Sequence, residues 1–351
     1  MIRITKDFIG GNIAVVDRTD HDVFLENELR DSDSDWFYWA FCVENAQGKE
    51  LTFHLQKSRL GYWGPAVSHD LKEWHWLGEC GKNAFTYRFA ENETKVYFAH
   101  HILYPYERFF ALTKRHGLET NTLCMTKKGR SVPFLSFGEG ENTVMLTARH
   151  HACESTGSYV LEGVLEELLS CPLPNTRVFC VPFVDLDGVL DGDQGKNRIP
   201  HDHNRDYTND PIYPEVAAIK RYAEDHGCHF AFDFHSPWHR GGENDQIFMV
   251  QNSVDRAAEY DRFGALLEKE CNEASMTYRR ENDHPPCTGW NQPSSNFSYV
   301  MQCRHECRLA FSLESAYFGC AENKVSASRL MELGKAFGRA FRQYVEADVV
   351  L

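Results

Sequence analysis

Residues 143–170 read TVMLTARHHACESTGSYVLEGVLEELLS, and this stretch decides the fold. It begins with an apolar run, TVMLTA, and ends in a segment whose apolar residues recur three and four positions apart, as on one face of an amphipathic helix. Those residues are Val160, Leu161, Val164, Leu165, Leu168 and Leu169. Ser155 or Thr156 is expected to cap the start of the helix. A strand followed by a helix is the repeating unit of an α/β sheet.

The same alternation continues toward the C-terminus. Further apolar runs are VFCVPFV (178–184), FAFDFH (230–235), QIFMV (246–250) and LAFSLE (309–314), and helical patterns cover residues 213–226 and 326–347. Continuous apolar runs are typical of strands that are buried on both faces. We therefore predict an α/β fold with a mixed, mostly parallel sheet flanked by helices.

The first third of the chain is predicted to be all-β. Its runs are short, aromatic and β-branched, and several alternate with a period of two. They are DVFLE (22–26), WFYWAFCVE (36–44), LTFHL (51–55), FTYRF (85–89) and KVYFAH (95–100). The segments 44–50 and 90–95 are typical of hairpin connections. We predict a β-sandwich domain over residues 1–112 and an α/β catalytic domain over residues 113–351.

Length and composition narrow the classes of function. A chain of 351 residues suits two domains, and a net charge of −14 argues against nucleic acid and anionic membrane as partners. The N-terminus lacks a basic start followed by an apolar run, and no stretch approaches the ~20 apolar residues of a membrane span. We therefore expect a cytoplasmic protein whose 12 cysteines are reduced, with the oligomeric state left open.

Candidate metal ligands follow the predicted strands. Ligands of α/β sheets bind beyond the carboxyl ends of the strands. His151 and Glu154 could supply two zinc ligands from one turn, although Glu154 also suits an ordinary helix start, where it would favour the helix dipole. A third ligand must come from elsewhere, and His235, at the end of FAFDFH, is the best candidate. The competing histidines are His201, His203, His229 and His239.

Two further features suit hydrolytic chemistry. Glu314 ends the apolar run LAFSLE, so it could act as a general acid/base or could be an ordinary carboxylate in solvent. The loop GKNRIPHDHNRDY (195–207) places Arg198 and Arg205 near Asn204. Arginine binds carboxylates with paired hydrogen bonds, but the loop could also be an exposed basic segment of an acidic protein.

Five motifs in this order resemble the zinc metallocarboxypeptidase family, and more closely its cytosolic carboxypeptidase branch, which includes the tubulin deglutamylases. They are ARHHACE (148–154), VPFVDLDGV (181–189), DHNRDY (202–207), FDFH (232–235) and FSLES (311–315). Asp185 and Leu186 replace the Asn-Pro that is usual in the second motif. The resemblance implies that His151 is the ligand, because His150 would break the two-residue spacer before Glu154.

The resemblance implies a carboxypeptidase-like fold, a zinc cofactor and a peptide or protein C-terminal tail as substrate. His151, Glu154 and His235 would bind zinc, and Glu314 together with the metal would activate a water. Arg198 would stabilise the oxyanion, with Lys196 as its rival. The implied substrate-binding residues are Asn204 and Arg205, for the terminal carboxylate, and Arg149, which would orient the site or touch the substrate.

Some features keep other interpretations open. The deglutamylases carry an arginine where this chain has Ser298 or Tyr299, so a preference for acidic residues is not implied. Tyr299 and Tyr317 are candidates for the flexible tyrosine of the digestive enzymes. One alternative is a zinc amidohydrolase of the aspartoacylase or succinylglutamate-desuccinylase type, which acts on small N-acyl amino acids. The other is a non-catalytic binding protein. The β-rich start favours the peptidase over the amidohydrolase.

Overall fold

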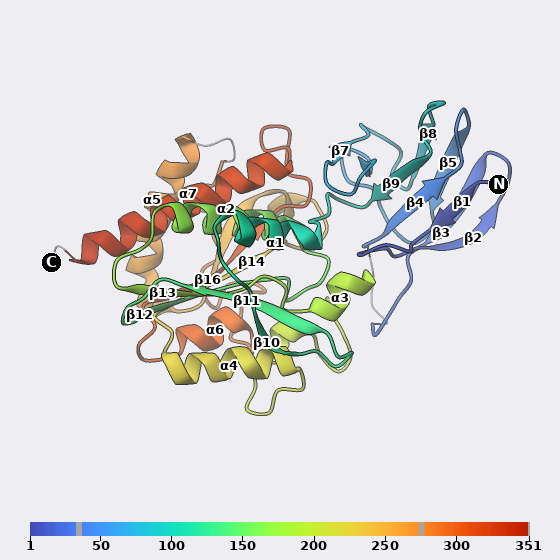
Figure 1. Cartoon of the computed structure of the whole chain (residues 1–351). Coiled ribbons are helices and arrows are strands. Elements are labelled where there is room, and N and C mark those ends of the chain that lie inside the picture. Colours follow the sequence, from blue (N-terminus) through green and yellow to red (C-terminus); the bar gives the residue numbers. More distant parts are fainter. Residues whose placement is uncertain (33–36, 274–276, 350–351) are drawn as a thin grey trace.

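The computed structural model describes residues 1–32, 37–273 and 277–349. Its N-terminal part is a sandwich of two β-sheets (Figure 1). The five-stranded sheet has the order β1 (Arg3–Thr5), β4 (Ala40–Glu44), β9 (Lys95–Ala99), β6 (Ala66–Ser68) and β7 (His75–Trp76). The four-stranded sheet has the order β2 (Ala14–Arg18), β3 (Asp22–Glu26), β5 (Glu50–Leu55) and β8 (Ala84–Arg88). Buried aromatic residues from both sheets, Phe41, Phe53, Phe85 and Phe98, form one core between them.

The prediction that two connections in this part are hairpins is wrong. Residues 44–50 join β4 to β5, and residues 90–95 join β8 to β9, so each connection crosses from one sheet to the other. Alternation shows which side chains face the core, but it does not show which sheet the next strand joins. The strand expected from residue 36 begins at Ala40, and residue 36 itself lies outside the described residues.

The rest of the chain is built around a seven-stranded sheet. Its order is β10 (Asn121–Met125), β11 (Ser131–Phe137), β13 (Thr176–Val181), β12 (Asn142–Ala148), β14 (Phe230–His235), β16 (Leu309–Ser315) and β15 (Ile247–Gln251). The central strands β13, β12, β14 and β16 are parallel, whereas the outer pairs β10–β11, β11–β13 and β15–β16 are antiparallel. The predicted mixed α/β sheet is confirmed, and its parallel part is the centre.

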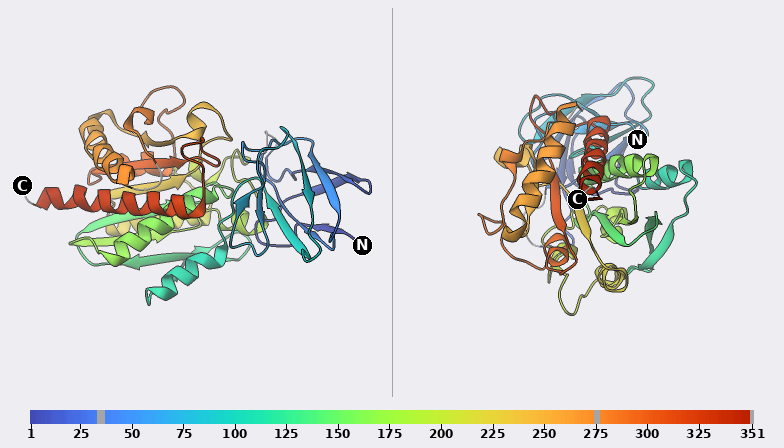
Figure 2. Two further views of the ribbon diagram at one scale, coloured as in Figure 1. Left: turned by 90° about the horizontal axis from the view of Figure 1, so that it is seen from above. Right: turned by 90° about the vertical axis from the view of Figure 1, so that its left-hand side faces the viewer.

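Helices cover both faces of this sheet (Figures 1 and 2). On one face lie α1 (Tyr106–Arg115), α2 (Ser155–Ser170), α5 (Ala257–Glu273) and α7 (Ala327–Val349); on the other lie α4 (Pro214–His226) and α6 (Phe297–Gln302). Phe109 and Leu112 of α1 belong to the core of the large sheet, and this helix spans the domain boundary expected at residue 112, which stays a prediction. No helix in the described ranges is long and apolar enough to cross a membrane.

The start of α2 differs from the expectation and brings two parts of the site together. Neither Ser155 nor Thr156 caps the helix; Glu154 occupies the N-cap position, and the two hydroxyls donate to the backbone oxygens of Ile102 and Ser315. A Cβ atom on Gly157 would lie 2.4 Å from the carbonyl oxygen of Phe234. Glycine therefore lets α2 approach the end of β14 closely, next to His235.

Candidate metal and catalytic site

The predicted site residues lie at the carboxyl ends of neighbouring strands. His151 and Glu154 occupy the turn after β12, His235 ends β14, and Glu314 is paired with His235 in the register of β14 and β16. Because parallel strands end at the same edge of a sheet, residues far apart in sequence meet there. The structure thus brings His151, Glu154, His235 and Glu314 to one edge.

Three of these residues could hold a metal ion. The Nδ1 atoms of His151 and His235 each lie 2.7 Å from an oxygen of Glu154, and one ligand atom from each residue lies within 4.8 Å of the others. Two imidazole nitrogens and a carboxylate form a ligand set that suits zinc. We call His151, Glu154 and His235 the metal cluster.

Each histidine of the metal cluster has a carboxylate beside its second nitrogen. His235 Nε2 lies 2.5 Å from Asp233 Oδ2, and His151 Nε2 lies 3.6 Å from Asp202 Oδ1. Such partners fix the tautomer and the orientation of a metal-bound histidine. Burial opposes a charged imidazole, but Asp233 and Glu154 raise the pKa of His235 well above its ordinary value. The surroundings of the cluster therefore favour positive charge.

Lys196 contacts the metal cluster directly. Its Nζ lies 2.7 Å from Glu154 Oε1 and donates to the backbone oxygens of Ser236 and Pro237, each at 3.0 Å. Burial acts to raise the pKa of Glu154, but Lys196, His151 and His235 hold that pKa well below its ordinary value. Glu154 is thus an ionised carboxylate, as a metal ligand must be.

A second group, His150, Asp233 and His235, also has metal-ligand spacing. Both ring nitrogens of His150 are already engaged, Nδ1 with Asp233 Oδ1 at 2.9 Å and Nε2 with the Tyr207 hydroxyl at 2.7 Å. All three residues are buried. This arrangement makes His150 a support for Asp233, which in turn orients His235. Sequence analysis missed Asp233, although a single acidic residue inside the apolar run FAFDFH was a usable signal.

A cavity of about 710 Å³ opens onto the metal cluster. His151, Glu154 and Glu314 line it together with the aromatic residues Trp238, Phe248 and Trp290. Trp238 and Trp290 are 45% and 55% exposed, so the cavity offers apolar surface to a ligand. Glu314 Oε2 is enclosed without a hydrogen-bond partner in the described part of the chain. Burial raises the pKa of Glu314 to about 7, and Glu154 acts in the same direction while His235 opposes it.

Comparison with known proteins gives the same fold. No protein-family model matches the chain. An uncharacterized protein of Zymomonas mobilis is 26% identical over 81% of each chain, and cytosolic carboxypeptidase 6 of Caenorhabditis elegans is 21% identical over 97% of this chain and 86% of that protein. A metallo-carboxypeptidase from Pseudomonas aeruginosa superposes with a TM-score of 0.81 at 20% identity, covering 98% of this chain and 99% of that one.

The chain has the metallocarboxypeptidase fold. This finding, together with the sequence similarity to cytosolic carboxypeptidases, confirms the resemblance inferred from the five motifs and supports the predicted class, a metallocarboxypeptidase enzyme. The fold implies a bound metal ion, and the metal cluster offers ligands that fit one.

In this metallocarboxypeptidase fold, Arg205 and Asn204 differ in their surroundings. Arg205 lines the cavity, is exposed, and donates to the backbone oxygen of Asn204 at 3.2 Å; it has no ion pair within residues 1–32, 37–273 and 277–349. Asn204 is buried, with Nδ2 lying 3.4 Å from His235 Nε2 and Oδ1 accepting from the backbone N–H of Phe297. Arg205 is thus free to bind an anion, whereas Asn204 braces the site.

Arg198 and Arg149 have their polar partners outside the metal cluster, although Arg198 also lines the cavity. Arg198 Nη2 lies 2.6 Å from Asp185 Oδ2 and 3.2 Å from Asp193 Oδ2, and Nη1 pairs with Asp31. Arg149 donates from Nε to the backbone oxygen of Ala152 at 2.7 Å and from Nη1 to Ser158 Oγ at 3.3 Å, and it is not among the residues that line the cavity. These contacts suit structural support for both residues.

The competing histidines lie outside the metal cluster. Among the described residues, each has other contacts: His201 lies 2.6 Å from Asp206, His203 stacks on Tyr213, His229 accepts from the backbone N–H of Thr143, and His239 packs against His100. The Tyr317 hydroxyl is buried 3.3 Å from Cys153 Sγ, while Tyr299 is half-buried. Neither tyrosine lines the 710 Å³ cavity.

Proposed function

We propose that this protein is a zinc-dependent metallocarboxypeptidase that removes C-terminal residues from peptides or protein tails. One observation carries the proposal: the ligand atoms of His151, Glu154 and His235 converge at a cavity that Glu314 also lines. The names of its relatives, cytosolic carboxypeptidases, support peptides as the class of substrate.

Zinc held by the metal cluster would act as a Lewis acid and lower the pKa of a bound water. Glu314 is placed to take the proton of the attacking water and to pass it to the leaving amine. Its pKa of about 7 suits both steps, because the carboxylate can gain and lose a proton near neutral pH. Among the described residues, no group forms a hydrogen bond with its Oε2 atom.

Lys196 is our candidate for stabilising the oxyanion. Positive charge placed beforehand in a site that excludes water stabilises the charge that develops on the carbonyl oxygen. Both residues line the cavity, but Lys196 Nζ lies beside Glu154, whereas the guanidinium of Arg198, the residue first implied by the motif order, is paired with Asp185 and Asp193. We therefore assign the oxyanion role to Lys196 and a structural role to Arg198.

Arg205 is our candidate for binding the terminal carboxylate of the substrate. It is an exposed cation on the cavity wall without an ion pair in the described part of the chain. Arginine holds a carboxylate with two parallel hydrogen bonds. Asn204, next to it, would orient Arg205 through its backbone oxygen and His235 through its side chain. In this assignment Asn204 contacts the metal cluster and Arg205 contacts the substrate in the cavity.

The decisive experiment measures metal and activity together. We expect one zinc per chain in the purified protein, loss of that zinc in His151→Gln, and retained zinc in His201→Gln, a matched control because His201 lines the same cavity but contacts Asp206. Glu314→Gln should keep zinc while turnover falls by several orders of magnitude.

The substrates decide the reaction class. A peptide with a free C-terminus should be cleaved, one residue at a time. Zinc retention in His151→Gln would refute the metal cluster, and cleavage of small N-acyl amino acids without cleavage of peptides would favour the amidohydrolase instead. Near-normal turnover of Glu314→Gln would remove this residue from the mechanism.

A further inference from the structure

The loop of residues 192–198, GDQGKNR, contacts both the N-terminal sandwich and the metal cluster, and Gln194 is its third residue. The Gln194 side chain is 1% exposed. Its Oε1 accepts hydrogen bonds from the backbone N–H groups of Phe37, at 2.8 Å, and Tyr38, at 3.3 Å. Both residues directly precede the β4 segment of the sandwich. One buried side chain therefore fastens this loop to the sandwich.

The backbone of the same loop is fastened to the turn that carries Glu154. The carbonyl oxygen of Gln194 accepts a hydrogen bond of 3.0 Å from the N–H of Cys153, the residue before Glu154. Gly195 has φ 80°, and a Cβ atom there would lie 2.4 Å from the backbone nitrogen of Ala152. The loop thus lies directly against the turn, and Lys196, the next residue, reaches Glu154. A displacement of Gln194 would be passed on to both residues.

The sandwich also holds this turn from a second side. His101, which follows β9, is fully buried and donates from Nε2 to the carbonyl oxygen of Cys153 at 2.8 Å. Both backbone groups of Cys153 are therefore bonded, the N–H to the Gln194 loop and the carbonyl to His101. The residue beside the ligand Glu154 is positioned by contacts with the N-terminal sandwich.

We propose that Gln194 is a positioning residue for the metal cluster, through which the sandwich fixes Glu154 and Lys196. The inference rests on the proposed metal site but not on the peptidase reaction. Residues that orient metal ligands typically change metal affinity by about 10- to 100-fold when they are replaced. The sandwich would then be part of the scaffold of the site, because its contact with Gln194 determines how tightly the metal is held.

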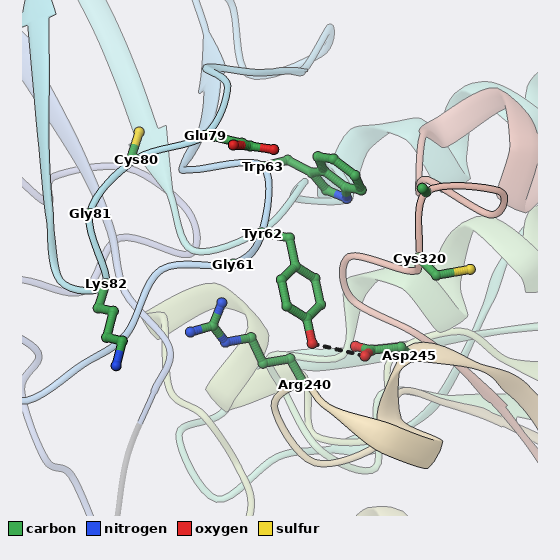
Figure 3. A pocket seen from close by; sticks show the side chains of 11 residues that line it. Gly61, Tyr62, Trp63, Glu79, Cys80, Gly81, Lys82, Arg240, Asp245 and Cys320 are labelled. Carbon is green, nitrogen blue, oxygen red and sulfur yellow. Dashed lines mark hydrogen bonds between the residues drawn. The ribbon is translucent and has the colours of Figure 1, made fainter.

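Another contact between the sandwich and the α/β part provides a control (Figure 3). The Tyr62 hydroxyl donates to Asp245 Oδ2 at 2.9 Å in a cavity of about 470 Å³, where the Arg240 guanidinium lies 5.0 Å from the Tyr62 ring. Asp245 belongs to the short helix η2 (Gly242–Asp245) after β14. Within the described residues, Tyr62 has no contact with the turn of Cys153 and Glu154. Tyr62→Phe therefore removes a contact between the two parts, here an exposed one between side chains, without touching the metal cluster.

The test is zinc affinity, measured by competition with a chromogenic chelator, alongside the melting temperature. Methionine has nearly the length of glutamine but cannot accept the two N–H groups, so Gln194→Met should bind zinc about 10-fold or more weakly. Gln194→Glu keeps an oxygen acceptor at the same distance and should bind zinc at least as tightly as the unmutated protein. Tyr62→Phe should lower the melting temperature without changing zinc affinity.

Two outcomes overturn the inference. One is an unchanged zinc affinity in Gln194→Met, and the other is an equal loss of affinity in Tyr62→Phe, because the loss would then reflect a loosened sandwich in general. If Gln194→Met does not fold, His101→Leu decides the question: it removes the other bond to Cys153, and unchanged zinc affinity there also overturns the inference. Failure of the unmutated protein to bind zinc would instead overturn the proposed function.

Discussion

Lys196 and Arg198 stand two residues apart on one loop, are both buried, and have opposite surroundings. Both line the cavity over the metal cluster, and Lys196 reaches Glu154 of that cluster. Arg198 is enclosed by the carboxylates of Asp185 and Asp193. The residue between them, Asn197, has φ 55°, a left-handed conformation that turns the chain there. Two cations of the same loop thus have different partners, and our proposal gives Lys196 a role in chemistry and Arg198 a role in stability.

The pairing of Arg198 with Asp185 also explains where the motif VPFVDLDGV departs from the family pattern. The metallocarboxypeptidase family, which the chain resembles, has Asn-Pro where this chain has Asp185 and Leu186. Asp185 caps α3 (Leu186–Asp191) by accepting from the backbone N–H of Gly188, and its other oxygen accepts two hydrogen bonds from Arg198. Burial, with Asp193 and Glu215, raises the pKa of Asp185 well above its ordinary value, and the two bonds from Arg198 favour the ionised form instead. An asparagine at this position would need no such cation. Asp185 and Arg198 are therefore best understood as a pair.

The largest expected effect tests Arg198 as a structural residue. Arg198→Met leaves Asp185 buried without its cation, while Asp193 keeps Arg30, and breaking a buried ion pair in this way costs roughly 3–5 kcal/mol. We expect the free energy of unfolding to fall by about that amount in denaturant titration. The protein that remains folded should keep its zinc and turn over within a few fold of the unmutated enzyme. A large loss of turnover at full stability would return the oxyanion role to Arg198.

The second prediction concerns Lys196, whose replacement should lower turnover and leave the zinc bound. Removal of one oxyanion-stabilising group typically costs about 10²–10³ in kcat. Lys196→Met should show such a loss at saturating substrate, with zinc still bound and KM changed far less. Lys196→Arg keeps the charge and should recover part of the rate. The assignment fails if Lys196→Met and Arg198→Met lose turnover equally.

The third prediction extends the comparison to a carboxyl group near Arg198 that forms no ion pair with a lysine or arginine within the described residues. Glu215 is buried in the first turn of α4, and burial, together with Asp187 and Asp206, raises its pKa from 4.5 to about 7. The folded state thus binds the proton more tightly than the unfolded chain does. Stability from this group is present below about pH 4.5 and is lost as the pH rises to about 7, by at most about 3 kcal/mol.

The variant Glu215→Gln tests the direction of this change in stability with pH. The amide cannot ionise, so the variant should lose this part of the pH dependence and be more stable than the unmutated protein above pH 7. Denaturant titrations at pH 5 and pH 8 would measure it. A variant less stable than the unmutated protein at pH 8 would show that the Glu215 carboxylate is compensated in the folded state.

The features of the fold and of the site that could be predicted are those that depend on residues close together in the sequence. His235 and Glu314 end continuous apolar runs, so their place at the edge of the sheet followed from sequence, and the order of the motifs gave His151 and Glu154. The opposite orientations of Lys196 and Arg198 did not follow, because a polar loop has no periodicity. Gln194 was missed because its partners, Phe37 and Tyr38, lie more than 150 positions earlier in the chain. The crossing connections of the sandwich were missed for the same reason.

Arg205, the third cation of this polar segment, completes the comparison, because it is exposed and has no ion pair in the described residues. If it binds the terminal carboxylate, each charge-assisted contact is worth roughly 1.5–3 kcal/mol, or about ten- to hundredfold in kcat/KM. The unmutated enzyme should therefore cleave a peptide with a free C-terminus much faster than its amidated counterpart.

Arg205→Ala should remove most of that difference by slowing the free acid alone, with little loss of stability, because an exposed side chain without an ion pair contributes little to folding. A purely structural role for Arg205, through its hydrogen bond to the backbone of Asn204, would instead slow both peptides equally and lower the melting temperature. The two peptides measured side by side separate these cases. Equal cleavage of both by the unmutated enzyme would exclude a carboxypeptidase, because nothing in the reaction would then depend on the free end of the chain.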